Sequence, residues 1–145
     1  ISHTQNAIEN IAFMTVNFNS DFIAHFNCSW TSPVKVRQTF LGGDKKMIVY
    51  NDIEPSEKIR VYDTGFQHTT DEDKARILVD YRTGDVFIPK LSNHEALTSV
   101  AADFISSIRE NNIPLANAEL GLQVVKILEA SQVSIKNRGK EVKIN

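Results

Sequence analysis

Two cations stand close together early in the sequence. Lys35 and Arg37 follow Pro33, and residues two apart in an extended strand lie on the same face. An ammonium and a guanidinium supply the N–H donors that bind a carboxylate or a phosphate. Ordinary cross-strand pairing with a carboxylate explains the same pattern. Candidate partners for such pairing are Glu54, Glu57 and Asp63.

A tyrosine and an arginine form a second candidate group. Tyr81 and Arg82 stand beside Thr83-Gly84-Asp85, whose residue types suit a tight turn. A phenol hydroxyl and a guanidinium bind carboxylate or phosphate oxygens, although a plain hairpin accounts for these residues nearly as well. We take Lys35, Arg37, Tyr81 and Arg82 as the candidate binding residues, for a substrate if the chain is part of an enzyme.

Other signals point to no further chemistry. Cys28 is predicted to be a buried apolar residue, because it has no base close in sequence. Gly42-Gly43 precedes a strand rather than a helix, so it is a hairpin turn and not a phosphate-binding loop. The acidic run at 71–73 has no calcium-binding loop around it. The histidines, which are too scattered to predict a metal site, are His3, His25, His68 and His94.

The bulk composition is that of an ordinary globular protein. With 145 residues, 41% hydrophobic and 23% charged, the chain is predicted to form one domain over 1–145. A formal charge of -2 gives no reason to expect binding to nucleic acid or to an anionic membrane. No apolar run approaches the ~20 residues of a membrane span, and a single cysteine is typical of a reducing compartment. We expect a cytoplasmic protein.

The first part of the chain shows the period-two alternation of β-strands. Short turns between these segments predict a largely antiparallel sheet of about seven strands. The polar segment 64–74 is predicted to be a solvated loop, and 83–85 a turn between the last two strands. The predicted strands are 10–19, 22–30, 34–41, 46–50, 58–62, 77–81 and 86–88.

From Leu91 onward the apolar residues follow helical spacing. Ser92–Glu95 has the spacing of a capping box, and Asn111–Pro114 should end this first helix. A second helix is predicted to begin near Asn117, with Gly139 at its C-terminal cap and a possible edge strand at 142–144.

Strands followed by helices indicate an α+β fold, a mainly antiparallel open sheet with two helices packed on one face. Several strands carry large apolar residues on both faces, as with Ile48 beside Val49. Two helices cover only one face of such a sheet. The uncovered face is therefore predicted to bind a second copy of the chain.

Several segments together resemble the C-terminal domain of the glucose–fructose oxidoreductase and inositol 2-dehydrogenase (Gfo/Idh/MocA) family. They occur in order and cover nearly the whole chain. The segments are Ser29–Arg37, Lys46–Asp52, Pro55–Tyr62, Tyr81–Pro89, Asp103–Ile108, Pro114-Leu115, Glu119–Val125 and Leu128–Ser134.

This resemblance implies a role in oxidoreduction. Family members are two-domain enzymes that act mostly on sugars, polyols and nucleotide sugars. An N-terminal Rossmann domain binds NAD or NADP, and the C-terminal domain lines the substrate cleft and forms homo-oligomers through its open sheet. The family's glycine-rich fingerprint, Glu-Lys-Pro lysine and Asp-x-x-x-His pair are not found in this sequence.

We therefore expect a fragment that begins at Ile1, lacks the cofactor site and catalytic residues, and is inactive alone. The alternative is a free-standing α+β module that binds a small ligand or oligomerises without catalysis.

Overall fold

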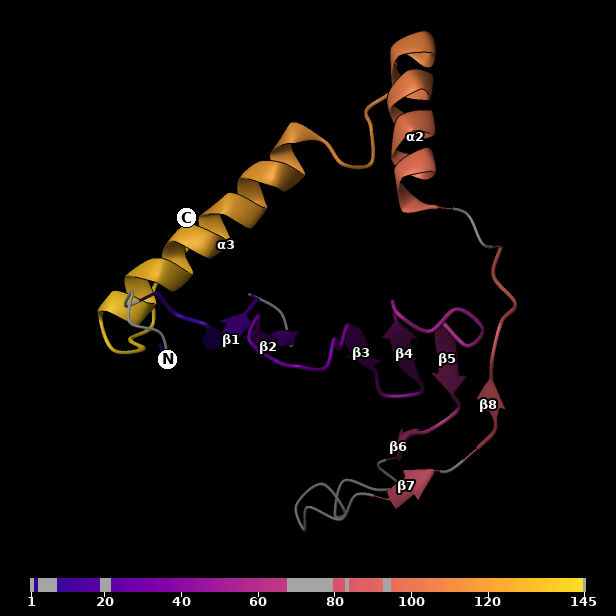
Figure 1. Cartoon of the computed structure of the whole chain (residues 1–145). Coiled ribbons are helices and arrows are strands. Elements are labelled where there is room, and N and C mark those ends of the chain that lie inside the picture. The colour runs from indigo at the N-terminus through magenta and orange to yellow at the C-terminus, as the bar shows by residue number, and fades with distance from the viewer. Residues whose placement is uncertain are drawn as a thin grey trace. The chain divides into compact units, whose positions relative to one another are not determined.

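The computed structural model describes residues 2, 8–18, 22–67, 80–82, 84–92 and 95–144 (Figure 1). The chain divides into two compact units, one made of Ile1–Ser32 with Glu95–Asn145 and the other of Pro33–His94. In chain order the elements are β1 (Ile11–Asn17), β2 (Ile23–Ser29), β3 (Gln38–Gly42), β4 (Met47–Asn51), β5 (Ile59–Tyr62), β6 (Gly65–Gln67), β7 (Asp80–Arg82), β8 (Val86–Phe87), α2 (Ala96–Glu110) and α3 (Ala118–Lys136).

The predicted α+β class is confirmed, but the prediction of one sheet with about seven strands is wrong. Within the described residues the strands form antiparallel sheets of two, four and two strands: β1–β2, β3–β4–β5–β8 and β6–β7. Residues 30–37, between β2 and β3, lie in no strand. Pro33 in this segment has no N–H to donate to a ladder. The predicted packing of two helices on one sheet face stays a prediction.

In the first unit, β1 and β2 form the predicted hairpin. Their register runs from Ile11 opposite Ser29 to Asn17 opposite Ile23, so the apolar alternation of the two strands falls on one face. Beyond the strand ends, the rings of Phe18 and Phe22 lie 5.1 Å apart between centroids. The shared face carries Ala12, Met14 and Val16 of β1 and Ala24, Phe26 and Cys28 of β2.

Helix α2 begins later than predicted. Its N-cap is Glu95, which has an extended backbone and makes no side-chain cap bond, so the predicted capping box starting at Ser92 is wrong. The predicted end is confirmed, because Asn111 adopts a left-handed conformation (φ 55°) and its N–H donates to the Ser107 carbonyl.

Helix α3 begins and ends as predicted. The Asn117 side chain accepts a hydrogen bond from the Leu120 N–H at 2.9 Å, which satisfies a free donor of the first turn. At the other end, the N–H of Gly139 donates to the Ser134 carbonyl at 2.8 Å and that of Arg138 to the Ile135 carbonyl at 3.1 Å. This is a Schellman cap. Residues 142–144 are not in a strand, so the predicted edge strand is wrong.

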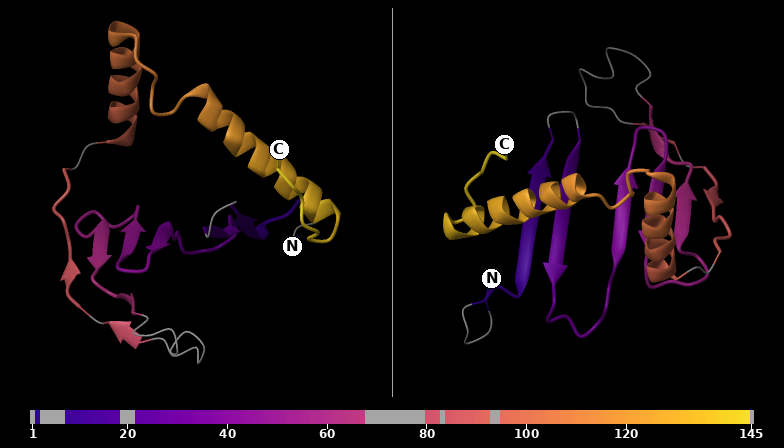
Figure 2. Two further views of the ribbon diagram at one scale, coloured as in Figure 1. Left: turned by 180° about the vertical axis from the view of Figure 1, so that it is seen from behind. Right: turned by 90° about the horizontal axis from the view of Figure 1, so that it is seen from above.

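In the second unit, the four-stranded sheet is apolar on both faces. Cross-strand partners share a face and neighbours along a strand alternate. We call the two sides the Ile48 face and the Val49 face. The Ile48 face carries Thr39, Leu41, Ile48, Tyr50, Ile59, Val61 and Phe87. The Val49 face carries Gln38, Phe40, Met47, Val49, Asn51, Arg60, Tyr62 and Val86. Figure 2 shows the strands of this sheet from two further directions.

The last strands do not pair as predicted. β8 pairs with β5, and β7 pairs with β6, so the predicted hairpin of the last two strands is wrong. β6 lies in the segment predicted as a loop. The pairing of β5 with β8 continues past both strands, because the Asp63 N–H donates to the Asp85 carbonyl at 2.9 Å. None of the helices in the described part is long and apolar enough to cross a membrane.

The backbones around Asp63 and Asp85 lie so close together that position 84 is predicted to require glycine. A Cβ at Gly84 would lie 2.5 Å from the Asp63 carbonyl oxygen, whereas one at Gly42 would meet nothing within 4 Å. We expect Gly84→Ala to lower the free energy of unfolding by about 1–3 kcal/mol, measured by urea denaturation. Gly42→Ala is the matched control. Equal stability of the two variants would contradict the predicted clash.

Candidate functional site

The structure separates the two cations that the sequence places together. Lys35 and Arg37 precede β3, which begins at Gln38, so the prediction that both project from one strand face is wrong. The chain bends at residues 33 and 34 and is not in a strand until residue 38. Arg37 pairs with Asp52, while Lys35 lines a small hollow.

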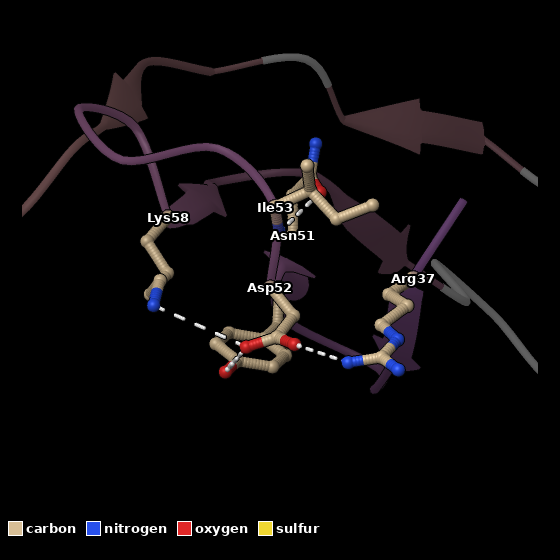
Figure 3. Close-up of polar contacts among 6 residues, drawn as sticks. Arg37, Asn51, Asp52, Ile53 and Lys58 are labelled. Atoms are coloured by element: carbon tan, nitrogen blue, oxygen red, sulfur yellow. Dashed lines mark hydrogen bonds and ion pairs between the residues drawn. The ribbon is translucent and has the colours of Figure 1, made fainter. Parts of the chain in front are cut away.

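The Asp52 carboxylate, just after the end of β4, has three partners: Arg37, Tyr50 and Lys58. We call these four residues the Asp52 cluster. The Tyr50 hydroxyl donates to Asp52 Oδ1 at 2.9 Å. Arg37 Nη1 lies 3.5 Å from Asp52 Oδ2, and Lys58 Nζ lies 4.0 Å from Oδ1. Figure 3 shows Arg37 and Lys58 on opposite sides of the carboxylate.

Backbone hydrogen bonds hold the cluster in register. The Asp52 N–H donates to the Arg37 carbonyl at 3.0 Å, which continues the pairing of β3 with β4 by one residue. The Asn51 N–H donates to the Lys58 carbonyl at 2.8 Å, which does the same between β4 and β5. Both cations therefore flank Asp52 because their own backbones are paired beside it.

The cluster shifts the pKa of its acid and of its phenol. The hydrogen bond from Tyr50 is the largest influence and lowers the pKa of Asp52. Desolvation, the second largest, opposes it, and Arg37 and Lys58 lower the pKa further. The same hydrogen bond, with desolvation and the negative charge of Asp52, raises the pKa of Tyr50. The side chains of Arg37 and Asp52 are 61% and 41% exposed, so the pairing itself adds little stability.

Cross-strand pairing was one of the two explanations that the sequence left open for Arg37. The structure shows such a pair, but its carboxylate is Asp52 and not one of the three predicted residues. Glu57 instead lies near Arg60, with 4.0 Å between Oε2 and Nε. Sequence reasoning missed Asp52 because the predicted strand ends at residue 50, two residues before it. The signal that could have found it is the two-residue spacing from Tyr50, which places both side chains on one side.

The hollow beside Lys35 lies at the same end of the sheet. We call it the Lys35 hollow; it has a volume of about 150 Å³ and is lined by Lys35, Val36, Gln38, Asn51, Ile53 and Glu54. Gln38 and Asn51 are cross-strand partners. Figure 3 shows Asn51 and Ile53 on the side of the chain opposite the Asp52 carboxylate. The hollow and the Asp52 cluster therefore occupy opposite faces.

Two polar groups of the Lys35 hollow are held by local hydrogen bonds. Asn51 Oδ1 accepts from the Ile53 N–H at 3.2 Å. Glu54 Oε1 accepts from the Ser56 hydroxyl at 2.6 Å and from the Ser56 N–H at 3.2 Å. These two bonds are the main causes that lower the pKa of Glu54, so this carboxylate is ionised at neutral pH.

Tyr81 and Arg82 lie in β7, where their backbones pair with Phe66 and Gly65. Their side chains fall outside the described part of the structure, and their predicted substrate contacts stay predictions. Thr83 also lies outside the described residues.

The remaining candidate side chains from the sequence are Cys28 and the four histidines. Cys28 shares the apolar hairpin face but is exposed, so the prediction that it is buried is wrong. His25 Nδ1 lies 3.0 Å from the Thr15 hydroxyl oxygen, its cross-strand neighbour. His3, His68 and His94 fall outside the described residues. Within the described ranges, no three His, Cys, Asp or Glu side chains are grouped to hold a metal ion.

Comparison of the chain with models of protein families, with curated proteins and with solved structures finds no match. The family resemblance of the sequence therefore stays a prediction.

The hydrogen bond from Tyr50 predicts a measurable pKa change at Asp52. Tyr50→Phe removes the largest cause that lowers this pKa, so the pKa of Asp52 should rise toward its ordinary value. A carboxyl carbon NMR titration measures it. Tyr62→Phe, on the Val49 face, is the matched control and should leave Asp52 unchanged.

The same variant should alter acid stability. Because the folded pKa of Asp52 is lowered, its stabilising contribution is present above the unfolded pKa and is lost as pH falls through the folded pKa. Tyr50→Phe should shrink that loss. An Asp52 pKa that is the same in wild type and Tyr50→Phe would show that the hydrogen bond is absent in solution.

Proposed function

We propose that this chain is the C-terminal domain of an NAD(P)-dependent oxidoreductase that acts on a sugar, a polyol or a nucleotide sugar. In this role it lines the substrate cleft and joins subunits, while another domain binds the nicotinamide cofactor. The resemblance of the sequence segments supports the family, and the α+β class agrees with its C-terminal domain.

The observation that carries the proposal is the four-stranded sheet with two apolar faces. A soluble domain rarely leaves a large apolar patch in water, so each face needs a covering layer. Val49 is 8% exposed, but each face also has an exposed aromatic ring, with Phe40 58% exposed on the Val49 face and Phe87 66% exposed on the Ile48 face. In the proposal the Val49 face belongs to the core of the subunit, and the Ile48 face binds a second copy.

The Ile48 face has the composition of a self-association surface. A continuous row of apolar residues crosses all four strands on this face, and the polar Asp52 cluster borders it through Tyr50. An apolar centre with a polar margin is typical of stable interfaces, and Tyr and Arg are enriched in them. The row consists of Leu41, Ile48, Val61 and Phe87.

The described residues do not fit a nicotinamide cofactor. Dinucleotide binding uses a glycine-rich turn that leads into a helix N-terminus. Gly42-Gly43 instead closes a turn between β3 and β4, where the Gly43 N–H donates to the Lys46 carbonyl at 3.0 Å. The proposed contribution of this chain to the reaction is substrate binding, with Lys35 and Arg37 as the described candidates.

Self-association tests this proposal. Phe87→Glu places a charge in the apolar row and should weaken dimerisation about 30-fold or more, the size of an interface hot spot. Sedimentation equilibrium of the full chain measures it, and circular dichroism verifies folding. Ile113→Glu is the matched control, because Ile113 is 82% exposed and lies outside this sheet.

Two results would count against the proposal. One is a wild-type chain that remains monomeric at all concentrations. The other is a Phe87→Glu variant that associates as strongly as the wild type.

A further inference from the structure

The Lys35 hollow has binding groups that nothing else in the described chain uses. The side chains of Lys35 and Gln38 make no hydrogen bond or ion pair with any other described residue. Asn51 uses its oxygen for the Ile53 N–H, which leaves its NH₂ group available. Glu54 accepts from Ser56 at Oε1 and from the Glu57 N–H, and a carboxylate has further acceptor sites. The residues that line this small space therefore carry one ammonium, two carboxamides and one carboxylate.

Part of the lining of the hollow is apolar. Val36 and Ile53 contribute the aliphatic surface. Ligand sites commonly combine apolar walls with a few polar groups that fix orientation. A mixture of donors and acceptors on aliphatic surface matches a compound with C–H faces and several hydroxyl groups.

The charges that line the hollow favour an uncharged ligand over an anion. The hollow contains one ammonium, on Lys35, and one ionised carboxylate, on Glu54, so its formal charge is zero. An anion would gain from Lys35 but would be repelled by Glu54, whose lowered pKa keeps it ionised at neutral pH. A neutral hydroxyl group can accept from Lys35 and donate to Glu54.

The size of the hollow limits the ligand to a small one. A volume of about 150 Å³ is below the roughly 300–1,000 Å³ of common ligand pockets. We propose that the Lys35 hollow binds one uncharged sugar ring or short polyol through Lys35, Gln38, Asn51 and Glu54. This deepens the proposed function, on which it rests, by assigning the polyol contact to the side of Lys35 rather than to Arg37.

Binding of D-glucose and sorbitol to the full chain tests the site. In a nitrogen-15 NMR titration, the side-chain NH₂ signals of Gln38 and Asn51 should shift and saturate. The Kd expected for so small and open a site is on the order of 1–10 mM. Gln38→Ala should weaken binding about tenfold, and Thr39→Ala, one residue away on the opposite face, should leave it unchanged.

Glucose 6-phosphate tests the charge argument. It should bind no more tightly than glucose, because the hollow has no net charge. A tenfold preference for the phosphate would replace the polyol site with an anion site. Shifts that do not saturate, or that are equal in wild type and Gln38→Ala, would overturn the proposal as well.

Failure here is distinguishable from failure of the proposed function. Gln38 lies outside the apolar row, so Gln38→Ala should associate like the wild type. If sugars do not bind but Phe87→Glu still dissociates the chain, only the Lys35 hollow is rejected. If sugars bind to a chain that remains monomeric, the hollow stands and the self-association is rejected.

Discussion

The two apolar faces of the β3–β4–β5–β8 sheet constrain everything else in the second unit. Ile48 and Val49 are neighbours in one strand and lie on opposite faces. Ile48 pairs with Leu41 and Val61, and Val49 pairs with Phe40 and Arg60. A sheet with apolar side chains on both faces needs a layer on each side. In the proposal, one layer belongs to the same subunit and a second copy provides the other.

The polar groups that the proposals use stand at one end of this sheet. The residues around Asp52 alternate in direction because the pairing of β4 continues past its end on both sides, through bonds to the Arg37 and Lys58 carbonyls. That alternation directs Asp52 to one face and Asn51 to the other (Figure 3). The end of β4 thus positions the charged Asp52 cluster at the border of the Ile48 face. It also positions the Lys35 hollow, which has no net charge, on the opposite face.

Local patterns in the sequence predicted the elements well, and long-range pairing poorly. The hairpin of β1 with β2 and both ends of α3 follow from alternation, turn residues and caps. The partners of β7 and β8 do not follow from such patterns, because the residues around Gly84 are compatible with either a hairpin or a change of sheet. Arg37 was predicted as a cation within a strand, whereas β3 begins only at Gln38. Its pairing with Asp52 depends on the register of β3 and β4, which no local pattern fixes.

Burial of the Ile48 face on association is measured most directly by the accessibility of its methyl groups. A soluble paramagnetic agent broadens the NMR signals of exposed methyls. As protein concentration rises, the Ile48 methyl should become protected, while the methyl of Ile113, which is 82% exposed and far from this sheet in sequence, should keep its broadening. Broadening of the Ile48 methyl that stays the same at every protein concentration would contradict burial of this face by a second copy.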